Sequence, residues 1–263
     1  MPDISIRPVA EHAAQLADTI LEAVDVATSE NRKYLLGCPT GRTPTPLYKA
    51  MAERLARHPQ SLRALVLVMM DEYVEQAPDG NFTYIDAEAH NSCRRFARDD
   101  IQRRLNASLP ASMQLPDANV WFPGPHNPAA YDERISHAGG LGFFILASGA
   151  SDGHVAFNPP GTAAESRTRI VPLAEQTRID NMGTFPGFAS LDEVPTHGIS
   201  VGIATIAEAR SAAMLLFGAQ KAEAFRQITG VSDYRSEWPA TVIHLVRNGR
   251  ILADEAAAQV DAS

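Results

Sequence analysis

The clearest structural signal in this sequence is the segment LVLVMMDEY at residues 65–73. It begins with six apolar residues in a row, Leu65 to Met70, which no polar residue interrupts. A short run of this kind is typical of a strand that is covered on both faces, as in a parallel sheet between two layers of helices. The acidic residue Asp71 follows directly. The segment therefore predicts a buried strand that ends at a charged group.

Short apolar runs and helical patterns alternate along the chain around this segment. The first pattern, over roughly Val9 to Thr28, has the apolar spacing of an amphipathic helix. Further predicted strands lie at 34–36, 120–122, 141–147, 199–203 and 214–217, and further predicted helices at 47–57, 91–105, 128–137 and 220–229. This alternation predicts an α/β fold with a parallel sheet and helices on both faces.

The C-terminal part of the chain permits two interpretations. The apolar runs Val242 to Val246 and Ile251 to Ala253 flank Asn248-Gly249, a pair that favours a hairpin turn. The first run also fits one face of a helix, so the residues alone leave the choice open. The tail at 256–263 is expected to be frayed.

Composition restricts the class of protein and its partners. The chain has 263 residues, of which 45% are hydrophobic and 21% charged, which is typical of a protein with a packed core. Its net charge of -8 disfavours binding to nucleic acid. No apolar run approaches the ~20 residues that cross a membrane, and Met1-Pro2-Asp3 begins no secretory signal, so we expect a cytoplasmic protein. Cys38 and Cys93 predict reduced thiols.

Ligands of open parallel sheets bind at the carboxyl ends of the strands, and the first candidate segment there is GCPTGRTP at residues 37–44. Its backbone N–H groups and the following helix N-terminus suit an anion, to which Thr40 and Thr43 add hydroxyl donors and Arg42 adds positive charge. The Gly-Lys-Ser/Thr ending of a Walker loop is missing. The alternative is a turn in which Pro and Thr only start a helix.

The second candidate segment is Asp71-Glu72-Tyr73. Desolvation makes a carboxylate at the tip of a buried strand costly, and such a group suits a general base. The alternative is that Asp71 caps the next turn and that Glu72 is solvated.

The third candidate segment is SGASDGHVAFNPPG at residues 148–161, which follows the predicted strand at 141–147. His154 can exchange a proton near neutral pH, and Asp152 can orient it or act as a second carboxylate. The alternative is a packed or surface histidine without a catalytic role.

Together these segments resemble the glucosamine-6-phosphate deaminase/isomerase family. Motifs at 38–44, 70–74, 152–158 and 166–169 match in order and spacing, and the similarity extends from about Leu35 to Glu255. The segment around Lys221 is similar to the phosphate-binding lysine segment of the family. The wider superfamily contains 6-phosphogluconolactonases, and the continuation Val155-Ala156-Phe157-Asn158 is similar to the deaminase branch.

The resemblance implies a Rossmann-like, doubly wound sheet in a single domain over residues 1–263, with a small lid around 173–196. It implies no metal, no cofactor and a homo-oligomer. It also implies that Trp238 through Glu255 form a helix followed by a strand, which removes the hairpin interpretation.

The resemblance also implies roles for individual residues. Asp71 matches the base that moves a proton between C2 and C1 of the sugar, His154 matches the ring-opening residue, and Asp152 matches its carboxylate neighbour. A buried carboxylate and a group that titrates near neutral pH suit these steps chemically. The matches to the phosphate pocket are Thr40, Gly41, Thr43 and Lys221.

The sequence departs from the family at two positions of the site. Pro159 stands where the deaminases have a glutamate that relays protons with the histidine. Either Asp152 alone supports His154, or Glu165 or another carboxylate replaces the missing group, or the substrate does not need assisted ring opening. Gly183 stands where the lid of the family has an arginine that clamps the phosphate. These departures leave open which sugar phosphate is used and whether ammonia is released.

Three functions are compatible with these observations. The first is interconversion of the aldose and ketose forms of a sugar phosphate, with loss of ammonia from an amino sugar such as glucosamine 6-phosphate. The second is hydrolysis of a sugar-acid lactone, in which His154 would activate water. The third is a sensor that binds a sugar phosphate without turnover, although the chain has no recognisable DNA-binding segment.

We hypothesise that Arg42 supplies the positive charge that the lid lacks at Gly183. Replacing Arg42 by Ala should then raise KM for a phosphorylated substrate at least tenfold, which is about 1.4 kcal/mol of binding. Steady-state kinetics of the two proteins measure the change. An unchanged KM would indicate that Arg42 only points to solvent.

Overall fold

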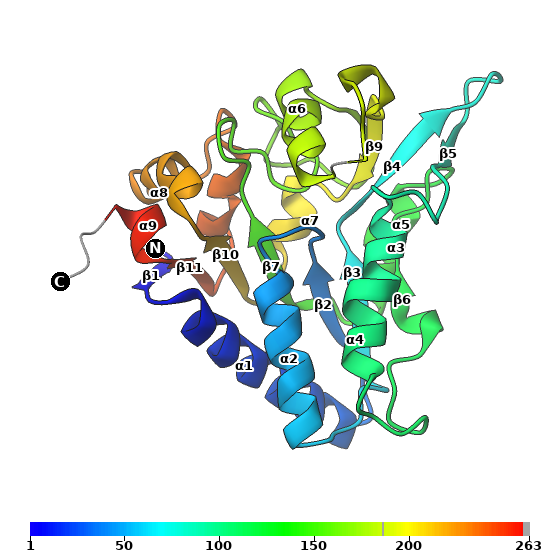
Figure 1. The fold of residues 1–263 in the computed structure, drawn as a ribbon, viewed down its shortest axis with the longest axis vertical. Coiled ribbons are helices and arrows are strands. Elements are labelled where there is room, and N and C mark those ends of the chain that lie inside the picture. Colours follow the sequence, from blue (N-terminus) through cyan, green and yellow to red (C-terminus); the bar gives the residue numbers. More distant parts are fainter. Residues whose placement is uncertain (186, 260–263) are drawn as a thin grey trace.

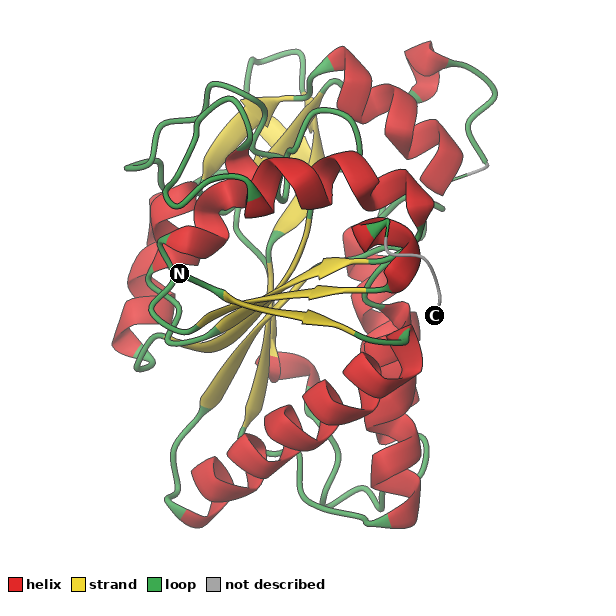
Figure 2. Ribbon diagram, turned by 90° about the vertical axis from the view of Figure 1, so that its left-hand side faces the viewer, coloured by secondary structure: helices red, strands yellow, loops and turns green. Residues whose placement is uncertain are grey.

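Two sheets form the framework of the protein (Figure 1). The computed structural model describes residues 1–185 and 187–259. The main sheet has seven parallel strands in the order β1-β11-β10-β7-β2-β3-β6, and a second, antiparallel sheet has the order β5-β4-β9-β8. The expected parallel sheet with helices on both faces is confirmed, as Figure 2 shows from the side.

The strands are short, and most of them are buried. Those of the main sheet are β1 (Asp3–Ile6), β2 (Tyr34–Cys38), β3 (Leu65–Met69), β6 (Val120–Trp121), β7 (Leu141–Ala147), β10 (Ala212–Leu216) and β11 (Gly249–Ala253). Those of the second sheet are β4 (Asp71–Gln76), β5 (Phe82–Tyr84), β8 (Arg169–Pro172) and β9 (His197–Ser200).

Helices cover each face of the main sheet. One face packs against α1 (Val9–Ser29), α2 (Thr45–Arg57) and a continuous helical segment of α3 (Cys93–Phe96), the π-helix η1 (Ala97–Gln102) and α4 (Arg103–Asn106). The other face packs against α5 (Ala129–His137), α7 (Ile203–Ala207), α8 (Ala222–Thr229), the 3-10 helix η5 (Pro239–His244) and α9 (Glu255–Ala258). Short 3-10 turns are η2 (Asp117–Asn119), η3 (Leu191–Glu193) and η4 (Ala219–Lys221), and α6 (Glu175–Thr184) lies beside the second sheet (Figure 1).

Alternate residues of the central strands enter two different hydrophobic cores. On β2, Leu35 belongs to one core and Leu36 to the other, and both are almost completely buried. Successive side chains of a strand point to opposite faces, so a strand covered on both sides needs apolar residues at every position. This explains why the strands read as uninterrupted apolar runs.

The order of the strands reverses next to β2. From β2 the chain proceeds outward to β3 and β6, and then returns to β7 on the opposite side of β2. Loops that leave neighbouring strands on the two sides of such a switch point diverge and create a crevice. The segments that follow β2 and β7 are the candidate segments at 37–44 and 148–161.

The second sheet was not predicted from the sequence. Strand β3 ends at Met69, and β4 begins only two residues later at Asp71. The N–H of Met70 donates to Cys38 O of the main sheet at 3.3 Å, and its carbonyl accepts from Val201 N, directly after β9, at 2.9 Å. Met70 therefore joins the two sheets through its own peptide groups.

The assignment of residues 199–203 to the parallel sheet was wrong. Strand β9 pairs in antiparallel fashion with β4 and β8. The apolar residues at 199–203 belong to two elements: Ile199 lies in β9, whereas Val201 follows this strand and Ile203 begins α7. All three are fully inaccessible, so burial makes the segment look like one parallel strand.

Glu72 anchors the start of the second sheet to the helical segment. Its side chain is completely buried, and its two oxygens accept hydrogen bonds from the backbone N–H groups of Tyr73, Cys93 and Arg94 and from the hydroxyl of Ser92, at 2.8 to 3.0 Å. Removing one partner of such a buried, charged network costs about 3–5 kcal/mol. The interpretation of Glu72 as a solvated residue is wrong.

The C-terminal part confirms a helical segment followed by a strand. Helix η5 precedes β11, which lies in parallel between β1 and β10. The tail was expected to be frayed, but α9 includes residues 256–258, while 260–263 lie outside the described residues. Within the described part of the chain, no helix is both long and apolar enough to span a membrane.

Candidate functional site

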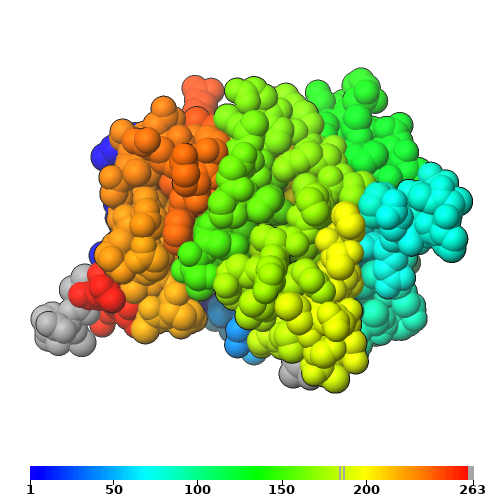
Figure 3. Space-filling model, turned by 90° about the horizontal axis from the view of Figure 1, so that it is seen from above, coloured from blue at the N-terminus to red at the C-terminus, as the bar shows by residue number. Residues whose placement is uncertain are grey.

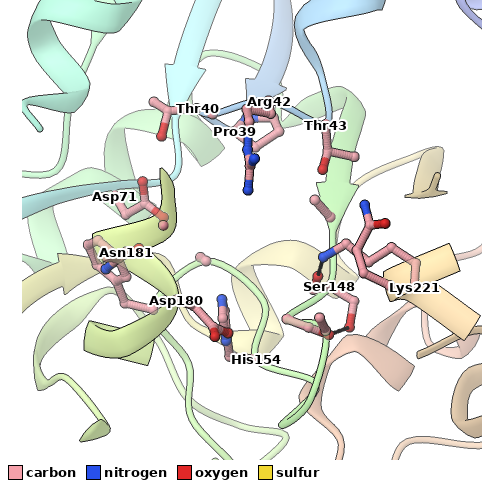
Figure 4. Close-up of a pocket in the computed structure, with 18 of the residues that line it drawn as sticks. Pro39, Thr40, Arg42, Thr43, Asp71, Ser148, His154, Asp180, Asn181 and Lys221 are labelled. Atoms are coloured by element: carbon pink, nitrogen blue, oxygen red, sulfur yellow. Dashed lines mark hydrogen bonds between the residues drawn. The ribbon is translucent and has the colours of Figure 1, made fainter. Parts of the chain in front are cut away.

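A cavity of about 750 Å³ lies at the carboxyl ends of β2, β3, β7 and β10. Of the eight residues predicted for the site, seven line it: Thr40, Gly41, Arg42, Thr43, Asp71, His154 and Lys221. The eighth, Asp152, contacts His154 from behind. Figure 4 shows Thr40, Arg42 and Thr43 on one side of the cavity, with Asp71, His154 and Lys221 around the rest of its border.

The segment after β2 forms a tight loop that opens onto helix α2. Gly41 has a φ of 88°, a conformation that favours glycine, and its carbonyl accepts a hydrogen bond from the Thr45 hydroxyl at 2.9 Å. The Tyr48 hydroxyl donates to Pro39 O at 2.8 Å and holds the start of the loop. Arg42 is exposed, yet its guanidinium points into the cavity (Figure 4). The loop and the N-terminus of α2 therefore present donors and positive charge to the cavity.

Lys221 supplies a second cation to the border of the cavity, from the segment after β10. Its Nζ donates to Ser148 O at 2.5 Å, which fixes the ammonium at the end of β7. Burial lowers the pKa of Lys221, and Arg42 lowers it further, whereas Asp180 raises it. An anion between Arg42 and Lys221 would relieve the repulsion of these two cations.

Asp71 is a buried carboxyl at the seam between the two sheets. Its side chain is 6% exposed, and its backbone pairs with Ser200 of β9, so it starts a strand rather than capping a turn. Burial raises its pKa to about 7; the hydrogen bond from Cys93 acts in the opposite direction, and the charge of Glu72 adds to the rise. A carboxyl of this kind can both accept and release a proton near neutral pH.

Cys93 is the donor that contacts Asp71, and no motif in the chain indicates this contact. Its Sγ lies 3.5 Å from Asp71 Oδ1 and 3.7 Å from the Thr40 hydroxyl. Burial raises the pKa of the Cys93 thiol well above its ordinary value, and the charges of Glu72 and Asp71 raise it further. The thiol therefore stays protonated and can donate to the carboxylate.

His154 and Asp152 form a close pair in the loop after β7. Nδ1 of His154 lies 2.7 Å from Asp152 Oδ1, and the same oxygen accepts from the His154 backbone N–H at 3.1 Å. Burial acts to raise the pKa of Asp152, but the hydrogen bond and the charge of His154 outweigh it and leave this pKa below its usual range. The imidazole is thereby held with Nδ1 engaged.

Gly149 makes room for this pair. A Cβ at Gly149 would lie 2.3 Å from Asp152 Oδ1 and 2.4 Å from His154 Nδ1, so no larger residue fits. After His154, Ala156 has a φ of 51°, a sparsely populated conformation for a residue other than glycine. The loop thus holds His154 against Asp152 by close packing.

Helix α6 supplies three residues of the cavity border that were not predicted for the site: Ile179, Asp180 and Asn181. Gly183, which was named above for the expected lid, also lines the cavity. Asp180 lies near the pair in the loop: Asp152, His154 and Asp180 each contribute one side-chain ligand atom, and the three atoms lie within 4.8 Å of one another. No motif in the sequence marks α6, since its contribution depends on how it folds back over the loop. Glu165, named above as a replacement carboxylate, is exposed and does not line the cavity.

The middle part of the chain covers the molecule on the side of the cavity. Seen from above, its green and yellow segments spread between the orange C-terminal part and the cyan region of β4 and β5 (Figure 3). The contact of α6 with the loop after β7 includes a hydrogen bond from the Thr177 hydroxyl to Asp152 Oδ2 at 3.4 Å.

Comparison with known proteins gives a consistent result. The family model described as glucosamine-6-phosphate isomerases/6-phosphogluconolactonase matches residues 8–252. The glucosamine-6-phosphate deaminase of Mycolicibacterium smegmatis is 34% identical over 90% of this chain and 85% of that protein. That of Pseudarthrobacter chlorophenolicus is 36% identical over 96% of this chain and 88% of that protein.

Solved structures show the same fold. A monomeric glucosamine-6-phosphate deaminase superposes with a TM-score of 0.81 at 25% identity, covering 98% of this chain and 99% of that one. The 6-phosphogluconolactonase of Leishmania guyanensis has a TM-score of 0.69 at 16% identity and covers both chains completely, a likeness that shows the fold alone.

The contact between Cys93 and Asp71 predicts a change in proton affinity. Replacing Cys93 by Ala removes the donor, so the pKa of Asp71 should rise above about 7 by roughly 0.7 pH unit, because one such hydrogen bond contributes on the order of 1 kcal/mol. Carbon-13 NMR titration of the aspartate carboxyls measures it without any assay of activity. Cys93→Ser keeps a donor and serves as the matched control. Equal midpoints in the Ala and Ser variants would contradict the contact.

Proposed function

The chain belongs to the family of glucosamine-6-phosphate isomerases and 6-phosphogluconolactonases, and from this premise we propose that it converts an aldose phosphate into a ketose phosphate. When C2 of the sugar carries an amino group, as in glucosamine 6-phosphate, the reaction also releases ammonia. One observation carries the proposal: Asp71, His154 and a cradle for an anion border the same cavity.

The phosphate occupies the side of the cavity that holds its positive charge. Backbone N–H groups after β2, the hydroxyls of Thr40 and Thr43, and the cations of Arg42 and Lys221 converge there. Charged donors bind phosphate oxygens strongly. Burial disfavours the ionised form of Lys221, and a phosphate anion beside the ammonium favours that form again. The phosphate thus orients the sugar.

Asp71 transfers the proton between neighbouring carbons. In the open-chain aldose, the ionised carboxylate removes the proton from C2 while O1 takes up a proton from solvent, which gives an enediol or enolamine. The same carboxyl then returns a proton to C1, and the hydroxyl or amino group at C2 loses one proton to leave a ketone or an imine. If C2 carries nitrogen, water then hydrolyses the resulting imine to the ketone and ammonia. A pKa near 7 balances removal against return of the proton at neutral pH.

His154 opens the sugar ring before this transfer. It takes the proton from the hydroxyl at C1 as the carbonyl forms and the bond from C1 to the ring oxygen breaks, and it delivers the proton to that oxygen. Asp152 holds the imidazole through Nδ1 for this exchange. One proton leaves one oxygen and one arrives at the other, so the step is balanced.

The position of α6 supports a lid. We propose that residues 173–196, of which the structure describes all but 186, form a lid over a single domain of residues 1–263. Asp180, Asn181 and Gly183 lie at the border of the cavity, which is where a lid would contact substrate. The expected homo-oligomer and the expected cytoplasmic location remain predictions; one structural relative is described as monomeric.

A sensor and a lactone hydrolase are the two alternatives to this proposal. The chain is an enzyme of its family, which leaves the sensor without support. Lactone hydrolysis would use His154 to activate water, and it requires no group that transfers a proton between carbons. The buried Asp71 favours the isomerase and deaminase reading, because a carboxyl with a pKa of about 7 beside the cavity suits transfer between carbons.

The decisive test is a panel of amino and neutral hexose and pentose phosphates, with 6-phosphogluconolactone included. Ammonia and ketose are measured together, and acid release is followed in parallel. We expect ketose from at least one phosphorylated aldose. Asp71→Asn should lower kcat ~100-fold or more and leave KM nearly unchanged, since the amide keeps the shape but cannot accept the proton. Acid release alone, or full activity of the Asn variant, would refute the proposal.

A further inference from the structure

Helix α6 presents Thr177 and Asp180 to the loop that holds His154, and Asn181 to the cavity. Thr177, Asp180 and Asn181 have the spacing of one helix face, three and four residues apart. Thr177 donates to Asp152, while Asp180 and Asn181 line the cavity. The face is therefore directed at the ring-opening pair of the proposed function.

Asp180 completes a group of two carboxylates around one imidazole. Asp152 is engaged at His154 Nδ1, and a carboxylate oxygen of Asp180 lies within 4.8 Å of a ring nitrogen of His154. One water or one sugar hydroxyl can span such a separation with two hydrogen bonds. Figure 4 shows Asp180 and His154 close together on the same side of the cavity.

The negative charge of Asp180 acts during ring opening, when the charge of His154 changes. During ring opening, His154 carries the proton of the sugar and is transiently positive, and two negative carboxylates then flank it. In a partly dehydrated cavity this attraction is stronger than in water. Gln176 donates to Asp180 Oδ1 at 3.0 Å and helps to hold the carboxylate in place.

We propose that Asp180 is a positioning residue for ring opening, whose carboxylate stabilises His154 while the imidazole carries the proton. This inference rests on the proposed function. Glu165, the carboxylate named above as a replacement, is exposed and does not line the cavity, and Pro159 carries no acid. Because Asp180 belongs to α6, the arrangement also links ring opening to the position of the proposed lid.

The test is a double-mutant cycle with Asp71, using glucosamine 6-phosphate as the probe. Asp180→Asn keeps the shape and removes the charge, and it should lower kcat at least tenfold with less than a threefold change in KM. In the Asp71→Asn background proton transfer between carbons limits the rate, and a slower ring opening then has little effect. Adding Asp180→Asn there should change kcat less than threefold.

Each outcome decides the matter. A tenfold loss in both backgrounds indicates a structural defect or a role in another step and overturns the inference, as does no loss in the parent protein. Glu175→Gln removes a charge from an exposed position of the same helix and should leave kcat unchanged. If the Asn variant does not fold, Asp180→Ala takes its place in the cycle.

Two further controls separate this inference from others. If the parent protein forms neither ketose nor ammonia from any sugar phosphate, the proposed function fails first, independently of Asp180. The same three side chains could also hold a metal ion. Activity of the parent protein that is lost in EDTA and restored by a divalent cation would overturn the role in ring opening in favour of a metal site.

Discussion

The site depends on the peptide groups of Met70, which hydrogen bond to both sheets at once. Because β3 passes into β4 within two residues, the next side chain, Asp71, must lie at the seam where the crevice of the main sheet opens. Glu72 then ties the seam to α3 through buried hydrogen bonds. The position of Asp71 is thus determined by backbone geometry, and the loops after β2 and β7 meet it from the switch point.

The burial of Asp71 lowers the stability of the fold, but it also gives the carboxyl a pKa that suits proton transfer. The pKa of Asp71 is near 3.8 in an ordinary environment and about 7 in the fold, so the folded state prefers the protonated form. The free energy of unfolding therefore falls as pH rises between these two values, and the full penalty is present above pH 7. Near neutral pH, Asp71 is both ionised and protonated in appreciable fractions, as a group that removes and returns a proton requires.

The sequence predicted those features of the fold and of the site that depend on local patterns of residues. The apolar run at 65–70 identified β3, and the segments that follow three strands, with the family resemblance for Lys221, located seven residues that line one cavity. The second sheet was missed because β8 and β5 are too short to show a period and because the buried residues at the end of β9 run on into the start of α7. Asp180 was missed for another reason: its place beside His154 arises from the packing of α6 against a distant loop, which no spacing in the chain records.

The central claim is that this cavity moves a proton between adjacent carbons of a phosphorylated sugar. The most direct measurement is NMR of the ketose formed from glucosamine 6-phosphate in D2O. The account predicts deuterium at C1, because the carboxyl of Asp71 exchanges its proton with solvent during part of the turnovers. A ketose whose C1 hydrogens come entirely from the substrate would show that the migrating hydrogen never exchanges with solvent, and this would contradict the account of Asp71 as an exchanging carboxyl.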